Sequence, residues 1–177
     1  AQRGKGVQRQ RYMDHTARLR QLKPAVAAMQ QGESLMAKER LPQAEERFAE
    51  ALSLAPDDYV ANMLMAKVKL AQKRPREAET YLAQARAIQP GEGQAQQLSG
   101  IVQLALNRPD AALQFFGGYD RLLPGNPNTT FLKGVAYENM QDRKQAAQHY
   151  YRYAQEVGAG KEAQYATSRL KAWGYVK

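Results

Sequence analysis

Prolines, small residues and large apolar residues recur along this chain at a fixed interval of about 34 residues. The proline column is Pro56, Pro90 and Pro124. Upstream lie two columns of small residues, Gly32, Ala66, Gly100 and Gly134, and Ala44, Ala78, Ala112 and Ala146. A large side chain follows at Phe48, Leu82, Phe116 and Tyr150. A fixed period of this length is typical of one small unit that is copied and stacked. We therefore look for function on a binding surface rather than in a catalytic pocket.

The period divides the chain into four units, residues 25–58, 59–92, 93–126 and 127–160. Each unit holds two stretches with the apolar spacing of a helix, and in the second unit these run over 59–72 and 75–88. No stretch alternates with the two-residue period of a strand. The small residues allow two helices to approach closely, and the large apolar residue fills the groove beside them. Because one helix pair cannot bury its apolar face alone, the pairs stack, and we predict an all-α fold of about four helix hairpins.

Two flanking segments complete the predicted organisation. Residues 1–24 are expected to form a basic N-terminal helical extension, and residues 161–177 a C-terminal capping helix that seals the end of the stack. The stripe that predicts the capping helix is Ala163, Ala166, Leu170 and Trp173. Inside a predicted helix, Gly117 and Gly118 indicate either close approach of a neighbouring helix, an early helix end, or a hinge.

These columns resemble the tetratricopeptide repeat (TPR) family. Its unit carries Gly or Ala at the eighth position, Ala at the twentieth, an aromatic at the twenty-fourth and Pro at the thirty-second. The resemblance covers residues 25–160 and implies a right-handed α-solenoid that serves as a non-catalytic protein–protein interaction module. The chain departs from the pattern at the fourth position, where no Trp occurs, and at Gly158, which stands where a proline is expected.

The resemblance also implies that the first helix of each unit lines a concave face. The predicted partner-binding groove consists of Val26, Met29, Met36, Val60, Met63, Lys67, Leu70, Ile101, Leu104, Phe131 and Val135. An apolar face of this kind favours an occupant, and we predict a peptide or helix of a protein partner. Tight curvature or the N-terminal helix could bury the strip instead, and both interpretations stay open. Because Lys67 alone could clamp a terminal carboxylate, the residues argue against a receptor for chaperone tails.

The sequence predicts no enzyme, cofactor or metal site within this chain. The two histidines, His15 and His149, are isolated, and there is no HExxH motif, glycine-rich phosphate loop or cysteine. No apolar run approaches the roughly 20 residues that a membrane-spanning helix needs. Catalytic residues and metal ligands are therefore predicted to be absent here.

Charge and aromatic content suggest two further functions. The formal charge is +9, and residues 1–23 carry seven basic residues against Asp14 alone. Such a segment could bind nucleic acid, although Tyr12 is its one aromatic side chain for stacking on bases. Eleven of the fifteen aromatic residues lie from Phe115 onward. They could pack a terminal core or form an interface, so a homo-oligomerising structural scaffold is the alternative to partner binding.

A second resemblance concerns residues 11–25, RYMDHTARLRQLKPA. They resemble the junction in bacterial zinc metallopeptidases of the BepA kind, where a protease domain with an HExxH motif precedes a TPR tail. The resemblance implies that this chain is the tail of a metallopeptidase, that it is periplasmic, and that envelope or outer-membrane assembly proteins are its partners. The residues themselves leave a cytoplasmic location open. The chain begins at Ala1 without a Met, so we expect a processed form or an excised piece.

Overall fold

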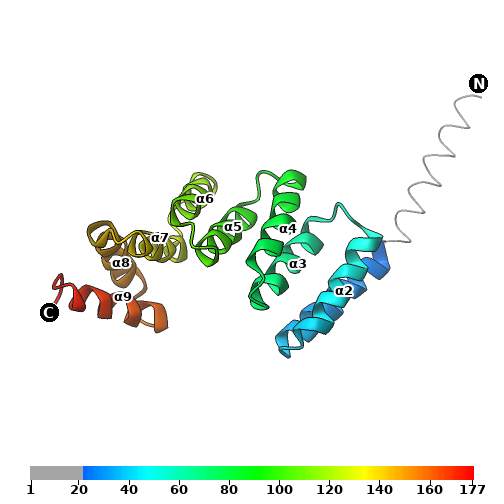
Figure 1. Ribbon diagram of the computed structural model, residues 1–177, viewed down its shortest axis with the longest axis horizontal. Helices are drawn as coiled ribbons and strands as arrows, with labels where there is room; N and C mark the ends of the chain where they lie inside the picture. Colours follow the sequence, from blue (N-terminus) through cyan, green and yellow to red (C-terminus); the bar gives the residue numbers. More distant parts are fainter. Residues whose placement is uncertain (1–21) are drawn as a thin grey trace, which may run out of the picture. The chain divides into compact units, whose positions relative to one another are not determined.

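The computed structural model describes residues 22–177, and in that range all regular structure is helical. Residues 22–37 are helical. They are followed by α2 (Leu41–Leu54), α3 (Tyr59–Ala71), α4 (Pro75–Ile88), α5 (Gly93–Ala105), α6 (Pro109–Leu122), α7 (Pro127–Asn139), α8 (Arg143–Val157) and α9 (Lys161–Ala172) (Figure 1). The predicted all-α repeat fold is confirmed.

The helices repeat with the period of the sequence. The first residues of successive helices are one period apart in the series α3, α5, α7 and α9, and likewise in the series α4, α6 and α8. Each of α3, α5 and α7 packs against the helix that follows it, which makes three helical hairpins. Residues 22–37 and α2 share one apolar core, so they form an earlier hairpin of the same kind.

The helix boundaries follow local chemistry. Pro75 and Pro109 are the first residues of α4 and α6, where the missing N–H leaves no backbone acceptor unpaired. At the start of α3 the Asp58 side chain accepts a hydrogen bond of 2.8 Å from the backbone N–H of Ala61. Asn126 caps α7 by accepting from the Asn128 N–H at 2.9 Å. These four helix starts are therefore set by residues within one turn of them.

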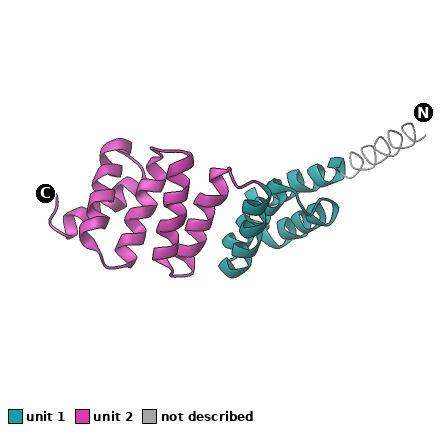
Figure 2. Ribbon diagram, turned by 90° about the horizontal axis from the view of Figure 1, so that it is seen from above, with its two compact units in different colours: residues 1–88 teal, residues 89–177 magenta. Residues whose placement is uncertain are grey.

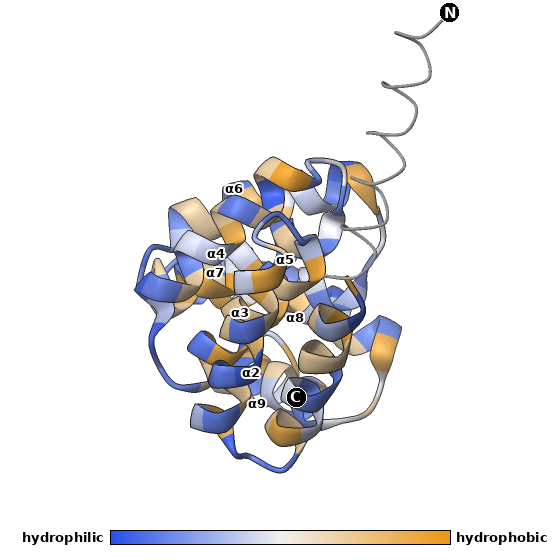
Figure 3. Cartoon of the chain, turned by 90° about the vertical axis from the view of Figure 1, so that its right-hand side faces the viewer, coloured by the Kyte–Doolittle hydropathy of each residue, from blue (hydrophilic) through white to orange (hydrophobic). Residues whose placement is uncertain are grey.

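The chain divides into two compact units, one ending at Ile88 and one beginning at Gln89 (Figure 2). Apolar and polar stretches alternate along single helices, as expected when one face of each helix is buried (Figure 3). The core of the first unit consists of Ala28, Met29, Ala44, Phe48, Ala51, Ala61, Leu64, Met65 and Val68. At the other end of the chain a second core consists of Ala146, Ala147, Tyr150, Tyr153, Ala163, Ala166 and Leu170.

The glycine column makes room for the aromatic column. A Cβ atom at Gly100 would lie 2.3 Å from Cε1 of the fully buried Phe116, and one at Gly32 would lie equally close to Phe48. At Gly134 the corresponding distance to Tyr150 would be 2.6 Å. Where the column holds alanine instead, at Ala66, the partner position holds the smaller Leu82. The spacing thus reflects one packing contact repeated in each hairpin.

Gly117 and Gly118 do not end their helix, because α6 continues to Leu122. A Cβ atom at Gly117 would meet nothing closer than Nη1 of Arg121, at 3.9 Å. At Gly118 the nearest atom would be Oε1 of Gln96 at 3.5 Å, an ordinary contact. The predicted close approach of a neighbouring helix is therefore wrong for both glycines, and so is the alternative of an early helix end.

Candidate functional site

The residues predicted to line the groove differ widely in exposure within the first unit. Val26 and Val60 occupy the same repeat position and are 44% and 50% exposed. Met29 and Met63 also share a position but are only 8% and 4% exposed. Lys67 is exposed, while Met36 and Leu70 are half-buried. Valine, rather than methionine, therefore supplies the accessible apolar surface on these first helices.

The buried methionines have a packing reason. Met29 belongs to the core that joins residues 22–37 to α2 and α3, where it lies among the side chains of Phe48 and Leu64. A methionine side chain fills irregular gaps in such a core because it is unbranched and flexible. A partner would therefore have to open this core to reach Met29, so the residue stabilises the helices that carry the exposed valines.

In the second unit the first helices α5 and α7 are neighbours. The Gln97 side chain on α5 donates a hydrogen bond of 3.2 Å to Oγ1 of Thr129 on α7. Of the predicted groove residues on these helices, Ile101, Leu104, Phe131 and Val135 are all half-buried. The two first helices therefore form one continuous face, but its apolar side chains are partly covered.

The chain itself covers part of that face. The Phe131 ring lies 5.1 Å from the ring of Tyr153 on α8 and 6.1 Å from that of Tyr165 on α9, measured between centroids. Val135 packs against the same C-terminal core. The C-terminal helices α8 and α9 thus partly bury the groove residues Phe131 and Val135 on α7. The N-terminal segment was also predicted to cover the groove, but its residues 1–21 lie outside the described residues. Most of the basic segment considered for nucleic-acid binding lies in the same range.

Glu138 fixes α9 in this position. Its carboxylate accepts hydrogen bonds from the hydroxyls of Tyr150, at 2.6 Å, and Tyr165, at 3.1 Å, and it forms an ion pair with Arg169. Burial, together with the adjacent carboxylate, raises the pKa of Tyr150 well above its usual value, so this phenol stays neutral. The Trp173 ring stacks on Tyr150 at 6.2 Å. Many of the clustered C-terminal aromatics are therefore packing groups.

A second charged cluster lies in the first unit. The Lys69 ammonium, whose side chain is 5% exposed, pairs with Glu45 on α2 and with Glu77 on α4, the latter at 2.9 Å. Arg74 pairs with both carboxylates. The hydrogen bond from Lys69 lowers the pKa of Glu45 and of Glu77. Although burial opposes the charge of Lys69, the two carboxylates outweigh it and raise its pKa. This cluster ties three helices together.

The described residues hold no cluster of side chains that could bind a metal ion. In residues 22–177 no three His, Cys, Asp or Glu side chains gather into a possible metal site. His149 stacks on Tyr137 at 5.4 Å, and burial followed by the charges of Lys133 and Arg152 lowers its pKa. Over the same range no helix is long and apolar enough to cross a membrane. His15 lies outside the described residues.

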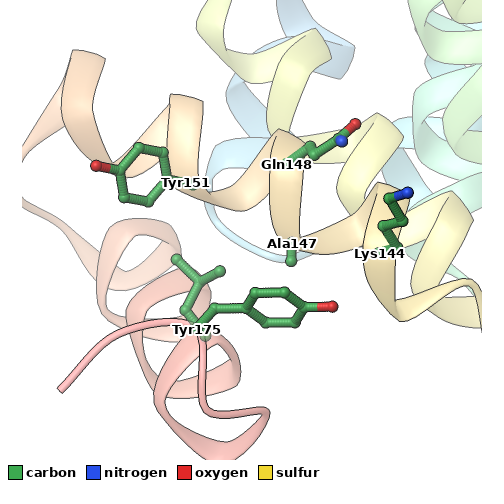
Figure 4. A pocket seen from close by; sticks show the side chains of 6 residues that line it. Lys144, Ala147, Gln148, Tyr151 and Tyr175 are labelled. Atoms are coloured by element: carbon green, nitrogen blue, oxygen red, sulfur yellow. The ribbon is translucent and has the colours of Figure 1, made fainter.

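The structure also has a pocket that the sequence does not predict. A pocket of about 280 Å³ opens between α8 and the segment that follows α9 (Figure 4). It is lined by Lys144, Ala147, Gln148, Tyr151, Leu170 and Tyr175. The spacing of the four lining residues on α8 is visible in the sequence. The position of Tyr175, on the opposite side, depends on how the chain turns after α9. The pocket lies on a second helix of the repeat rather than on the first-helix face.

The sequence and structural comparisons agree with this repeat architecture. Residues 35–100 match the family model described as tetratricopeptide repeat. Over this segment the chain is similar to TPR repeats. The segment overlaps the units predicted at 25–58 and 59–92 and includes the hairpin of α3 and α4. No curated protein was found that matches the chain.

Solved structures with the same fold include several TPR proteins. YrrB, described as a TPR protein with an unusual peptide-binding site, is 21% identical over 81% of this chain and 74% of its own, with a TM-score of 0.72. TTC0263, a thermophilic TPR protein from Thermus thermophilus, is 17% identical over 85% and 83%, with a TM-score of 0.73. The first TPR of Spaghetti (RPAP3), bound to an HSP90 peptide, is 17% identical over 68% and 95%, with a TM-score of 0.65. At these identities the likeness concerns the fold.

Proposed function

We propose that this chain is a non-catalytic module that binds an extended or helical segment of a partner protein on the first helices of its repeats. The TPR match and the fold shared with a structure that holds an HSP90 peptide support this proposal. Peptides can dock in such a groove through apolar anchors at regular spacing. The observation that carries the proposal is the exposure of Val26 and Val60 at equivalent positions.

The experiment replaces both valines with aspartate. Because the two side chains are about half exposed, the Val26→Asp and Val60→Asp substitutions leave the core intact while making the face polar and charged. Peptides are first selected from a random library displayed on phage, and one is then labelled for fluorescence polarisation. Losing about 1 kcal/mol of apolar contact at each valine weakens binding by roughly thirtyfold.

The matched control is a pair of exposed alanines on the second helices, Ala49 and Ala83, which are also separated by one repeat period. Ala49→Asp and Ala83→Asp introduce the same charge on another face, and we expect unchanged affinity. Circular dichroism checks that both double variants keep the helical content of the unmodified chain. If the valine variant binds the selected peptide as tightly as the control, this binding face is the wrong one.

The alternative is self-association, favoured by the exposed aromatic residues Tyr151, Tyr165 and Tyr175. A homo-oligomeric scaffold would use these rings to pair with another copy of the chain. Light scattering at several protein concentrations separates the two functions. A monomer that binds the selected peptide supports partner binding, whereas a stable dimer that excludes the peptide supports a scaffold.

We further propose that the chain is the TPR tail of a bacterial envelope metallopeptidase and that it works in the periplasm. This rests on the resemblance of residues 11–25 to the junction between protease domain and tail in the BepA kind of enzyme. The tail would present envelope proteins to the protease or dock it on outer-membrane assembly proteins. Sequencing the reading frame upstream of Ala1 tests the idea, because an HExxH motif is expected there. A continuous frame without that motif would refute it.

A further inference from the structure

The pocket beside α8 is built from two parts of the chain, α8 and the end of α9 with the segment that follows it. Its α8 wall consists of Lys144, Ala147, Gln148 and Tyr151, which are spaced so that they share one face of the helix. Figure 4 shows these side chains on one side and Tyr175 on the other. The pocket is thus a defined concavity rather than a gap between loosely placed helices.

The Tyr175 wall is held by a helix-terminating turn. Gly174 adopts a φ of 77°, which favours glycine, and reverses the chain after Trp173. The backbone N–H of Tyr175 then donates a hydrogen bond of 2.9 Å to the carbonyl of Leu170. This turn directs the Tyr175 ring back toward α8, with its hydroxyl on the side of Lys144 (Figure 4).

The interior of the pocket is apolar. Ala147 and Leu170 are buried and form its base, and the small side chain of Ala147 leaves the space open. Tyr151 and Tyr175 flank it and are 50% and 52% exposed. At about 280 Å³ the pocket is slightly smaller than typical ligand sites, so it suits one or two apolar side chains rather than a whole cofactor.

The charge that lines the pocket has one sign. Lys144 is the charged residue among the six that line it, and no acidic residue lines it. Residues 142–177 carry seven Lys and Arg against Asp142, Glu156 and Glu162. Asp142 caps α8 by accepting a hydrogen bond from the Gln145 N–H, and Glu156 is paired with Arg152 at 2.8 Å. A carboxylate placed beside Lys144 would therefore meet a cation and little local repulsion.

We propose that this pocket binds a protein segment in which an apolar side chain lies next to a carboxylate. The apolar side chain enters between Tyr151 and Tyr175 and contacts Ala147 and Leu170. The carboxylate pairs with the Lys144 ammonium at the rim. This would be a second recognition site, on the α8 side of the hairpin, and it does not depend on the valine face proposed above.

The test uses the full chain and a labelled, end-capped peptide, Ser-Gly-Asp-Leu-Phe-Asp-Gly-Ser, followed by fluorescence polarisation. We expect binding that weakens as salt increases, because an exposed ion pair is screened. Two control peptides separate the contributions: Asn in place of both Asp residues, and Ala in place of Leu and Phe. Each is expected to bind at least tenfold more weakly than the original peptide.

Protein variants locate the site. Lys144→Glu is expected to weaken peptide binding at least tenfold, because it removes the ion pair with the peptide carboxylate. Tyr175→Ala is expected to weaken it at least threefold, because it removes one apolar wall of the pocket. Lys161→Glu makes the same charge change at an exposed position on α9 outside the pocket, and binding should stay within twofold of the unmodified chain. The Val26→Asp and Val60→Asp double variant should also bind normally, which keeps this test independent of the first-helix proposal.

Several results would overturn the proposal. The first is that the peptide does not bind at millimolar concentration. The others are that Lys144→Glu and Lys161→Glu weaken peptide binding equally, or that the Asp and Asn peptides bind with equal affinity. The remaining occupant to consider is a second copy of this chain. If light scattering shows a dimer that Lys144→Glu separates into monomers, the pocket is a contact between copies and the peptide proposal fails.

Discussion

Replacing Gly100 with alanine tests the packing rule that underlies each repeat. The added methyl group would lie 2.3 Å from Cε1 of Phe116, and distances below 3.0 Å force a neighbour to move. Phe116 is fully buried, so its ring has no open space to enter. Gly117 offers a matched control, because it also lies inside a helix of the second unit but a Cβ atom there would meet nothing closer than 3.9 Å.

The expected magnitude follows from two opposing effects. Replacing Gly by Ala inside a helix contributes about 1 kcal/mol of stability at either position. Overpacking a close-fitting core costs about 1–3 kcal/mol, and this cost applies at Gly100 alone. The unfolding free energies of Gly100→Ala and Gly117→Ala should therefore differ by about 1–3 kcal/mol, with Gly117→Ala the more stable. The full burial of Phe116 favours the upper part of that range.

Urea unfolding followed by the fluorescence of Trp173 measures the difference. Trp173 is the single tryptophan of the chain, and its ring stacks on Tyr150, so it reports on the second unit. A double-mutant cycle with Phe116→Leu then isolates the contact, since the Ala66 and Leu82 pair shows that alanine suits leucine. In the leucine background Gly100→Ala should become stabilising. The reasoning is refuted if Gly100→Ala and Gly117→Ala are equally stable, or if alanine is equally costly in both backgrounds.

Two further stability predictions concern the charged clusters. Hydrogen bonds from Lys69 lower the pKa values of Glu45 and Glu77 in the folded chain. The two carboxylates therefore stabilise the fold above pH 4.5, their usual pKa, and this stabilisation is lost as the pH falls through their lowered pKa values. Lys69→Met should flatten that acid dependence in urea titrations by circular dichroism, and an unchanged slope would contradict this. Tyr150→Phe removes the hydrogen bond to Glu138 and should cost about 1.5–3 kcal/mol by Trp173 fluorescence. A loss below about 0.5 kcal/mol would mean that Glu138 is satisfied by its other partners.

Much of the fold could be predicted because its signals are local or periodic. Pro75 and Pro109 are the first residues of α4 and α6, a position that favours proline, and the Asn126 cap depends on the next two residues only. The glycine column predicts close helix packing because the missing Cβ is needed in each hairpin where the partner is aromatic, as at Gly100 and Phe116.

The turn conformation inside each hairpin could not be predicted from residue type. The residues Glu39, Lys73, Asn107 and Gln141 all have φ near +60°, and they too are spaced by one repeat period. Asparagine alone among them favours the left-handed region. The packing of the two helices therefore imposes this conformation on three residues that do not favour it, and no composition signal marks the column.

The candidate site was harder to predict because exposure depends on neighbours distant in sequence. Met29 and Val26 are both apolar and three residues apart, yet one is buried in the core and the other is open. The α8 pocket needs a wall supplied by Tyr175, which reaches α8 only through the turn at Gly174. Repeat position alone could not distinguish such side chains.

The register of α9 explains why the two proposed surfaces lie on different sides of the repeats. The helix α9 begins one repeat period after α7, and Tyr165 follows Phe131 by the same interval, so α9 takes the place of another first helix. The contacts of Tyr165 with Phe131 and Glu138 therefore cover the first-helix face at α7 from within the chain. The α8 side carrying Lys144 stays open beside Tyr175. Within the second unit, the apolar side chains open to a partner are therefore expected on α8 rather than on α7.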